Sequence, residues 1–215
     1  MKGLRIWFKK IDTAKFISHL DMIRLMERAI HKAKLPFWYT EGFNPHVFLT
    51  INMPISLGYT GLKESMDVKL LDDDYDFGLI IAKLNEGLPI DVRIFDVTEI
   101  VRKPGDVAFS EYEISLEKQE NLFECIKNLL EQKEIIVSKK TKKGVKEIDI
   151  KEDFNTMKIC EKGNEIVCTV VLPSSNQGSV NPRLFFDVLE EKFAKKIYPQ
   201  TARINSYTED MKEFI

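Results

Sequence analysis

The chain has 215 residues, of which 44% are hydrophobic and 31% charged, and its formal net charge is -2. This composition excludes a disordered polyelectrolyte and is typical of a soluble globular protein with one large or two small domains. No apolar run approaches the roughly 18 residues that cross a membrane. We therefore expect a cytoplasmic protein without a signal peptide or membrane segment, whose three cysteines, none in a CxxC pair, are reduced.

The near-neutral total hides an uneven distribution of charge. Residues 1–60 carry nine Lys/Arg against four Asp/Glu, residues 61–100 carry four against ten, and residues 137–151 carry six against two. Nucleic-acid binding requires a local basic surface rather than a basic whole protein. The two basic stretches therefore leave RNA binding open, beside the alternative that they are ordinary solvated faces.

Hydrophobic periodicity predicts the order β-α-β-β-α-β in the first half of the chain. Ser18 is the expected N-cap of the first helix, and Pro36 is expected to end it. Ile23, Met26, Ile30 and Ala33 are spaced to face the core. The expected strands cover residues 4–10, 47–56, 65–71 and 91–100, and the expected helices cover 18–35 and 74–86.

The same order recurs more loosely after a break at residues 103–105. Expected strands cover residues 110–116, 135–138, 158–160, 165–172 and 202–207, and expected helices cover 121–132 and 181–193. A basic loop spans residues 139–146. We therefore predict an α+β protein with two tandem ferredoxin-like (βαββαβ) domains, residues 1–102 and residues 106–215.

Several residues that could take part in catalysis or binding lie on the first expected helix. His19 lies in its first turn, where the helix dipole disfavours a cationic imidazole, so it is a candidate general base or a simple hydrogen-bonding group. Asp21 is a candidate catalytic carboxylate or a helix cap. Arg24 and Arg28 are four residues apart and share a face, where they suit a phosphate or an ion pair.

The loop after this helix has a different character. Gly42 permits unusual backbone angles, and a proline fixes the approach to His46, the candidate catalytic partner of His19. Rigid loops with polar and aromatic groups are typical of binding sites. The candidate substrate-binding residues are Arg24, Arg28, Tyr39, Glu41, Phe43, Asn44, Lys140, Lys142 and Lys143.

Several familiar motifs are absent from the sequence. It has no GxxxxGK[ST], GxGxxG, GxSxG or HExxH motif. It also lacks the C-x₃-C-x₂-C triplet of a radical-SAM iron–sulfur cluster. We expect no metal site, because the histidine and carboxylate spacing matches no standard one.

The SHLD motif (residues 18–21) and the GFNPH motif (residues 42–46) belong to a longer pattern. With them come Phe16, Ile17, Arg24, Arg28, Ala29, Leu35, Pro36, Tyr39, Pro54, Leu57, Gly58, Glu64 and Asp67. This pattern resembles the radical-SAM-linked family, an uncharacterised bacterial family, most strongly over residues 4–70. Weaker likeness continues through residues 143–150, Asn181, Pro182 and Arg203, but Lys151 stands where the family often has arginine.

The resemblance implies a partner rather than a reaction. Family members occur free-standing or as the C-terminal part of cobalamin-binding radical-SAM proteins, and this chain looks like the free-standing form. S-adenosylmethionine, the iron–sulfur cluster and cobalamin would then be bound by a partner enzyme and not by this chain.

Three functions follow as hypotheses. The first is an accessory or substrate-recognition protein that acts with a radical-SAM enzyme and binds RNA, either tRNA or rRNA. The second is a metal-independent RNA-processing or RNA-modifying enzyme that uses His19 and His46, similar to tandem ferredoxin-like endoribonucleases. The third is a protein-docking module without nucleic acid.

Overall fold

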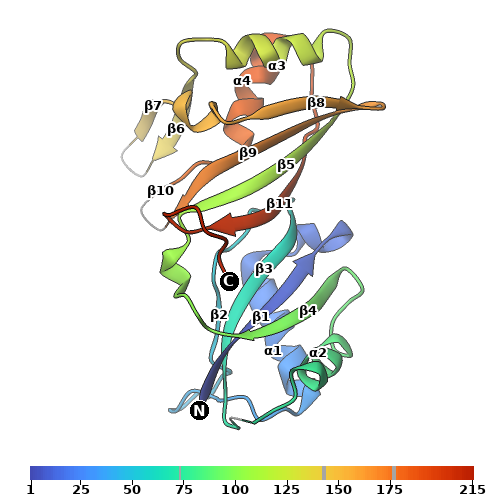
Figure 1. Cartoon of the computed structure of the whole chain (residues 1–215), viewed down its shortest axis with the longest axis vertical. Coiled ribbons are helices and arrows are strands. Elements are labelled where there is room, and N and C mark those ends of the chain that lie inside the picture. Colours follow the sequence, from blue (N-terminus) through green and yellow to red (C-terminus); the bar gives the residue numbers. More distant parts are fainter. Residues whose placement is uncertain (73, 142–143, 176–177) are drawn as a thin grey trace. The chain divides into compact units, whose positions relative to one another are not determined.

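The computed structural model describes residues 1–72, 74–141, 144–175 and 178–215 of the chain (Figure 1). The chain divides into two compact units. Unit 1 comprises residues 1–106 together with 213–215, and unit 2 comprises residues 107–212. In the described part of the chain, no helix is long and apolar enough to cross a membrane.

Unit 1 is an antiparallel sheet with helices packed on one face. In chain order its elements are β1 (Lys2–Lys10), α1 (His19–Ala33), β2 (Leu49–Ile51), β3 (Thr60–Leu70), α2 (Phe77–Asn85) and β4 (Val92–Glu99). The strands are ordered β2-β3-β1-β4 in the sheet, and each pairs with its neighbours in the antiparallel direction. Short 3-10 helices cover Asp12–Phe16 and Pro104–Asp106.

The core of unit 1 lies between the sheet and the two helices. Every second residue of β1, namely Leu4, Ile6 and Phe8, is buried there, as the period of a strand requires. From α1, Met22 and Met26 pack against them. Burying one such apolar side chain contributes roughly 1.5–3 kcal/mol, so this face of the sheet supplies much of the stability of the unit.

The other face of this sheet carries a buried polar network. The guanidinium of Arg5 is fully buried and forms two hydrogen bonds to Asp67, Nε to Oδ1 at 2.8 Å and Nη2 to Oδ2 at 3.0 Å. Asn52 donates from Nδ2 to the same Oδ1 at 2.8 Å and to the Ser65 hydroxyl at 3.0 Å. The ring of Phe214 lies 4.2 Å from the Arg5 Cζ. The segment Glu213–Ile215 therefore helps to cover this face of unit 1.

Unit 2 repeats the order of elements with an insertion. Its sheet has the order β8-β9-β5-β11, again antiparallel, and β10 pairs with the end of β9. The inserted β6 and β7 pair only with each other in the described ladders. The elements are β5 (Phe109–Glu117), α3 (Leu122–Leu130), β6 (Ile136–Thr141), β7 (Gly144–Asp149), a 3-10 helix (Glu152–Phe154), β8 (Lys158–Lys162), β9 (Glu165–Ser175), β10 (Gly178–Ser179), α4 (Arg183–Phe193) and β11 (Gln200–Tyr207).

The α+β class predicted from the sequence is confirmed. In each unit the strand order is compatible with the predicted ferredoxin-like arrangement, which stays a prediction. The expected N-cap of α1 is also confirmed, since the Ser18 hydroxyl accepts a hydrogen bond from the Asp21 N–H at 3.2 Å. The inward stripe of α1 differs from the expectation, because Met22 and Ala29 are fully buried whereas Ile23 and Ala33 are only partly so.

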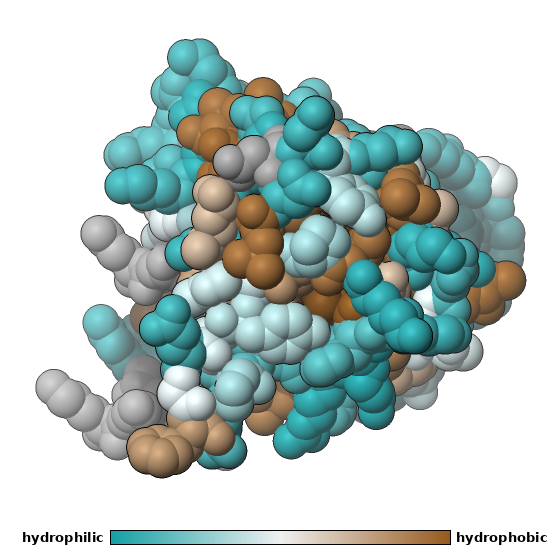
Figure 2. Space-filling model, turned by 90° about the horizontal axis from the view of Figure 1, so that it is seen from below, coloured by the Kyte–Doolittle hydropathy of each residue, from teal (hydrophilic) through white to brown (hydrophobic). Residues whose placement is uncertain are grey.

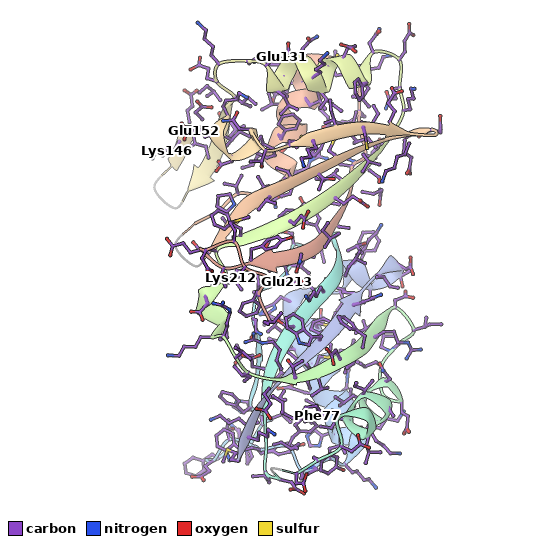
Figure 3. All side chains as sticks on the ribbon, in the orientation of Figure 1. Phe77, Glu131, Lys146, Glu152, Lys212 and Glu213 are labelled. Carbon is purple, nitrogen blue, oxygen red and sulfur yellow. The ribbon has the colours of Figure 1, made fainter. Side chains whose placement is uncertain are left out.

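Two predicted elements were wrong. The strand expected over residues 47–56 is only the short β2, because the segment before it folds back as a hairpin, with Phe48 donating from its N–H to the Trp38 carbonyl at 3.1 Å. Residues 142–143 of the expected basic loop at 139–146 lie outside the described residues, whereas residues 139–141 and 144–146 lie on β6 and β7, which form the β6–β7 hairpin. Its base is fixed by Asp149, whose carboxylate accepts the main-chain N–H groups of Ile135 and Lys151 at 2.8 and 2.9 Å. Figure 3 labels Lys146, which lies on β7 of this hairpin.

Candidate functional site

The first turn of α1 places Asp21 as a cap and not as a free carboxylate. Its Oδ2 accepts the Ser18 hydroxyl at 2.7 Å, and its Oδ1 accepts Nη1 of Arg24 at 2.9 Å. The Ser18 hydrogen bond, followed by that of Arg24, lowers the pKa of Asp21 below its ordinary value. Asp21 therefore stays ionised and satisfied at the helix N-terminus, where a negative charge is favourable.

His19 is the first residue of α1 and lines a small cavity at the end of the sheet. The cavity holds about 20 Å³, the room that one water molecule needs. Its lining also includes Lys10 and Glu64, each only 3% exposed. The Lys10 ammonium donates to the Ile17 carbonyl at 2.8 Å. Gly61 makes space here, since a Cβ at its position would lie 2.4 Å from the Glu64 side chain.

Lys10 and Glu64 are not among the site residues predicted from the sequence. A signal was present, because Lys10 follows Phe8 at the two-residue period of the buried positions of β1. A charged residue in that register predicts a buried polar group with a specific partner. Glu64 has no such local signal, because it reaches the same place only through the pairing of β3 with β1, in which it lies opposite Phe8.

His46 lies at the other end of α1 from His19. It follows a turn in which its N–H and Nδ1 contact the Thr40 hydroxyl at 3.2 and 3.0 Å. The next residue pairs with Tyr39, whose ring packs edge-on against His31 with centroids 5.3 Å apart. His31 is twelve residues along the helix from His19, which corresponds to roughly 18 Å. The structure therefore does not bring the two candidate catalytic histidines together.

An exposed stripe of α1 carries the two candidate arginines. Arg24, Arg28 and His31 are three or four residues apart, so they share one face of the helix, and all three are exposed. Arg24 is paired with Asp21. Arg28 makes no hydrogen bond or ion pair with any residue that the structure describes, which leaves its planar fork available to an anion.

The segment 38–48 is a hairpin that packs beside this stripe. Tyr39 contacts His31, and burial, followed by the nearby Glu27 charge, raises the pKa of Tyr39 above its ordinary value. The tip carries Glu41, Phe43 and Asn44, all exposed, and the Phe43 ring is completely exposed. We name Arg24, Arg28 and His31 together with this hairpin the α1–hairpin surface.

The turn at the tip of the hairpin depends on Gly42, whose φ is 125°. A residue with a Cβ is strained in that conformation.

Figure 2 views the molecule from below and shows that the hydrophobic residues on this side form small groups, which are separated by hydrophilic residues.

The candidate lysines belong to unit 2. Lys140 lies on β6, whereas Lys142 and Lys143 lie outside the described residues. The positive charge of this region follows from the sequence, because residues 139–146 include five lysines. Among the residues that the structure does describe, no group of three or more His, Cys, Asp or Glu side chains could hold a metal ion.

Comparisons with known proteins give a family and no activity. No curated protein sequence matches the chain. A crystal structure of an unknown protein from Galdieria sulphuraria is similar at 13% identity over 93% of this chain and 98% of that one, with a TM-score of 0.28, and this likeness supports no inference. A family model described as an uncharacterised protein conserved in bacteria (DUF2344) matches residues 3–182. The chain therefore belongs to this uncharacterised bacterial family.

Proposed function

We propose that this chain binds a single-stranded segment of RNA through the α1–hairpin surface. Its role is that of an accessory or substrate-recognition protein for a radical-SAM enzyme. The observation that carries the proposal is Arg28, an exposed guanidinium without a carboxylate partner among the described residues, on a helix beside a hairpin that holds Phe43 fully exposed. Guanidinium groups bind phosphates, and exposed aromatic rings stack on unpaired bases.

Single-stranded RNA fits this surface better than a duplex does. Sequence-specific recognition of RNA mostly targets unpaired loops and ends, whose bases are free to stack on aromatic side chains. The lysines of residues 139–146 add positive charge elsewhere in the chain, which strengthens non-specific attraction to phosphates. The radical-SAM part of the proposal rests on the sequence resemblance alone, and the cofactors of that chemistry would belong to the partner enzyme.

RNA binding is tested by titrating the protein into fluorescently labelled tRNA and rRNA fragments at several salt concentrations. We expect Arg28→Ala to weaken binding and to lower the slope of log affinity against log salt by about 1, because one phosphate contact is lost. Lys83→Ala is the matched control, since Lys83 is on α2 and is paired with Glu86. Affinity no better than micromolar at physiological salt, with no fall as salt rises, would refute RNA binding.

The partner is tested separately. Tagged protein is recovered from nuclease-treated extract, and the proteins bound to it are identified by mass spectrometry. Recovery of a radical-SAM enzyme supports the accessory role. If the chain recovers a radical-SAM enzyme but does not bind RNA in the titration, the hypothesis of a protein-docking module without nucleic acid is favoured.

A further inference from the structure

The opposite side of the hairpin carries an aromatic cluster with a cation. Trp38 and Phe48 come from the two arms of the hairpin, and their ring centroids are 5.6 Å apart at an interplanar angle of 53°. The ammonium of Lys69, on β3, lies 4.9 Å from the Trp38 centroid and 4.5 Å from the Phe48 centroid. All three side chains are half-buried, so each retains some accessible surface.

Main-chain hydrogen bonds hold these three residues in place. The Trp38 N–H donates to the Lys69 carbonyl at 2.9 Å, and the Phe48 N–H donates to the Trp38 carbonyl at 3.1 Å. The three residues are therefore neighbours across adjoining extended segments. The backbone is therefore already ordered, so little backbone entropy remains to be lost when a ligand binds there, which favours affinity.

The positive charge of Lys69 is not neutralised by a neighbouring carboxylate among the described residues. Lys69 makes no ion pair with any residue in the described part of the chain. Asp67, two residues before it on the same strand, is already bonded to Arg5 and Asn52. The ammonium is thus stabilised by the ring faces, and its N–H donors remain available to an anionic group.

We infer that Trp38, Phe48 and Lys69 form a nucleotide subsite that stacks one RNA base and donates to the adjacent phosphate. Phosphate alone would not need the rings, and an apolar ligand would desolvate the ammonium without pairing it. A nucleotide supplies both a π face and an anion. This inference rests on the proposed function and extends the binding surface from the α1 side of the hairpin to its other side.

The test is fluorine NMR of the full chain labelled with 5-fluorotryptophan. Its two tryptophans, Trp7 and Trp38, give two resonances, which a Trp38→Phe variant assigns. Trp7 is 4% exposed and serves as the internal reference. On titration with a single-stranded RNA decamer, the Trp38 resonance should shift and that of Trp7 should not. Inorganic phosphate at the same phosphate concentration should leave both unchanged.

Two variants separate stacking from charge. Phe48→Leu should weaken RNA binding about tenfold with the salt slope unchanged, because a stacking face is lost. Lys69→Met should lower the salt slope by about 1. An unchanged Trp7 resonance in each variant shows that unit 1 is still folded.

The failures of the two proposals are distinguishable. Salt-dependent RNA binding that Arg28→Ala weakens, but without a Trp38 shift or an effect of Phe48→Leu, overturns the subsite and leaves the proposed function standing. No RNA binding by the wild-type chain overturns both.

Discussion

Removing the carboxylate of Asp67 should destabilise unit 1 strongly. In Asp67→Ala, the fully buried Arg5 guanidinium loses both hydrogen bonds to its partner, and Asn52 loses one acceptor. Leaving one charge of a buried pair without its counter-ion costs about 3–5 kcal/mol. The contact of Phe214 with Arg5 offsets little of this, because a cation–π contact contributes only about 0.5–2 kcal/mol and is already present in the wild type.

The assay is urea unfolding followed by tryptophan fluorescence. Trp7 and Trp38, which are the chain's two tryptophans, both lie in unit 1, so the signal reports this unit. Glu99→Ala is the control, since the Lys2–Glu99 pair is largely exposed on the Glu99 side and should contribute less than about 1 kcal/mol. An Arg5→Met/Asp67→Leu double variant should recover most of the loss, because it removes both charges. A loss for Asp67→Ala as small as that for Glu99→Ala would refute the reasoning.

Further predictions concern the cysteines, the β6–β7 hairpin and α1. Burial raises the pKa of Cys168 to about 12, so iodoacetamide at pH 8 should label exposed Cys160 and reach Cys168 only after unfolding, as peptide mass spectrometry would detect. Hydrogen bonds from the main-chain N–H groups of Ile135 and then Lys151 lower the pKa of Asp149 below its ordinary value. The contribution of Asp149 to stability is thus present above that ordinary pKa and is lost as the pH falls through the lowered pKa. The protection of amides at this base, measured as the exchange rate relative to the intrinsic rate at the same pH, should fall in acid for the wild type and should be low at all pH values for Asp149→Ala. Ser18→Ala should cost about 1 kcal/mol in urea unfolding, because α1 loses its N-cap.

Elements with local chemical signals could be predicted from the sequence. The Ser18 cap of α1 is predictable in this way, because its signal lies within a few residues of the structure that it determines. The β6–β7 hairpin was interpreted as a loop, because five lysines within eight residues are typical of a solvated segment. The pairing of β6 with β7 depends on the hydrogen bonds of Asp149 and on the register between the two strands, which a short stretch of sequence does not reveal.

The candidate site was predicted less well than the fold. His19 and His46 are near in the sequence, but they lie at opposite ends of helix α1. The residues around His19 come from β1 and β3 instead. The subsite around Lys69 could not be found either, because it requires β3 to pair beside the hairpin. Contacts between distant segments follow from topology, and topology is what single-sequence patterns determine least.

The most direct test of the central claim is crosslinking of the tagged protein in its own cells. Bound RNA is then sequenced, and bound protein is identified by mass spectrometry. We expect one defined RNA to be recovered with the wild type and to be lost in an Arg24→Ala/Arg28→Ala double variant. Recovery of a radical-SAM enzyme without RNA, and with the double variant as efficient as the wild type, would contradict the central claim.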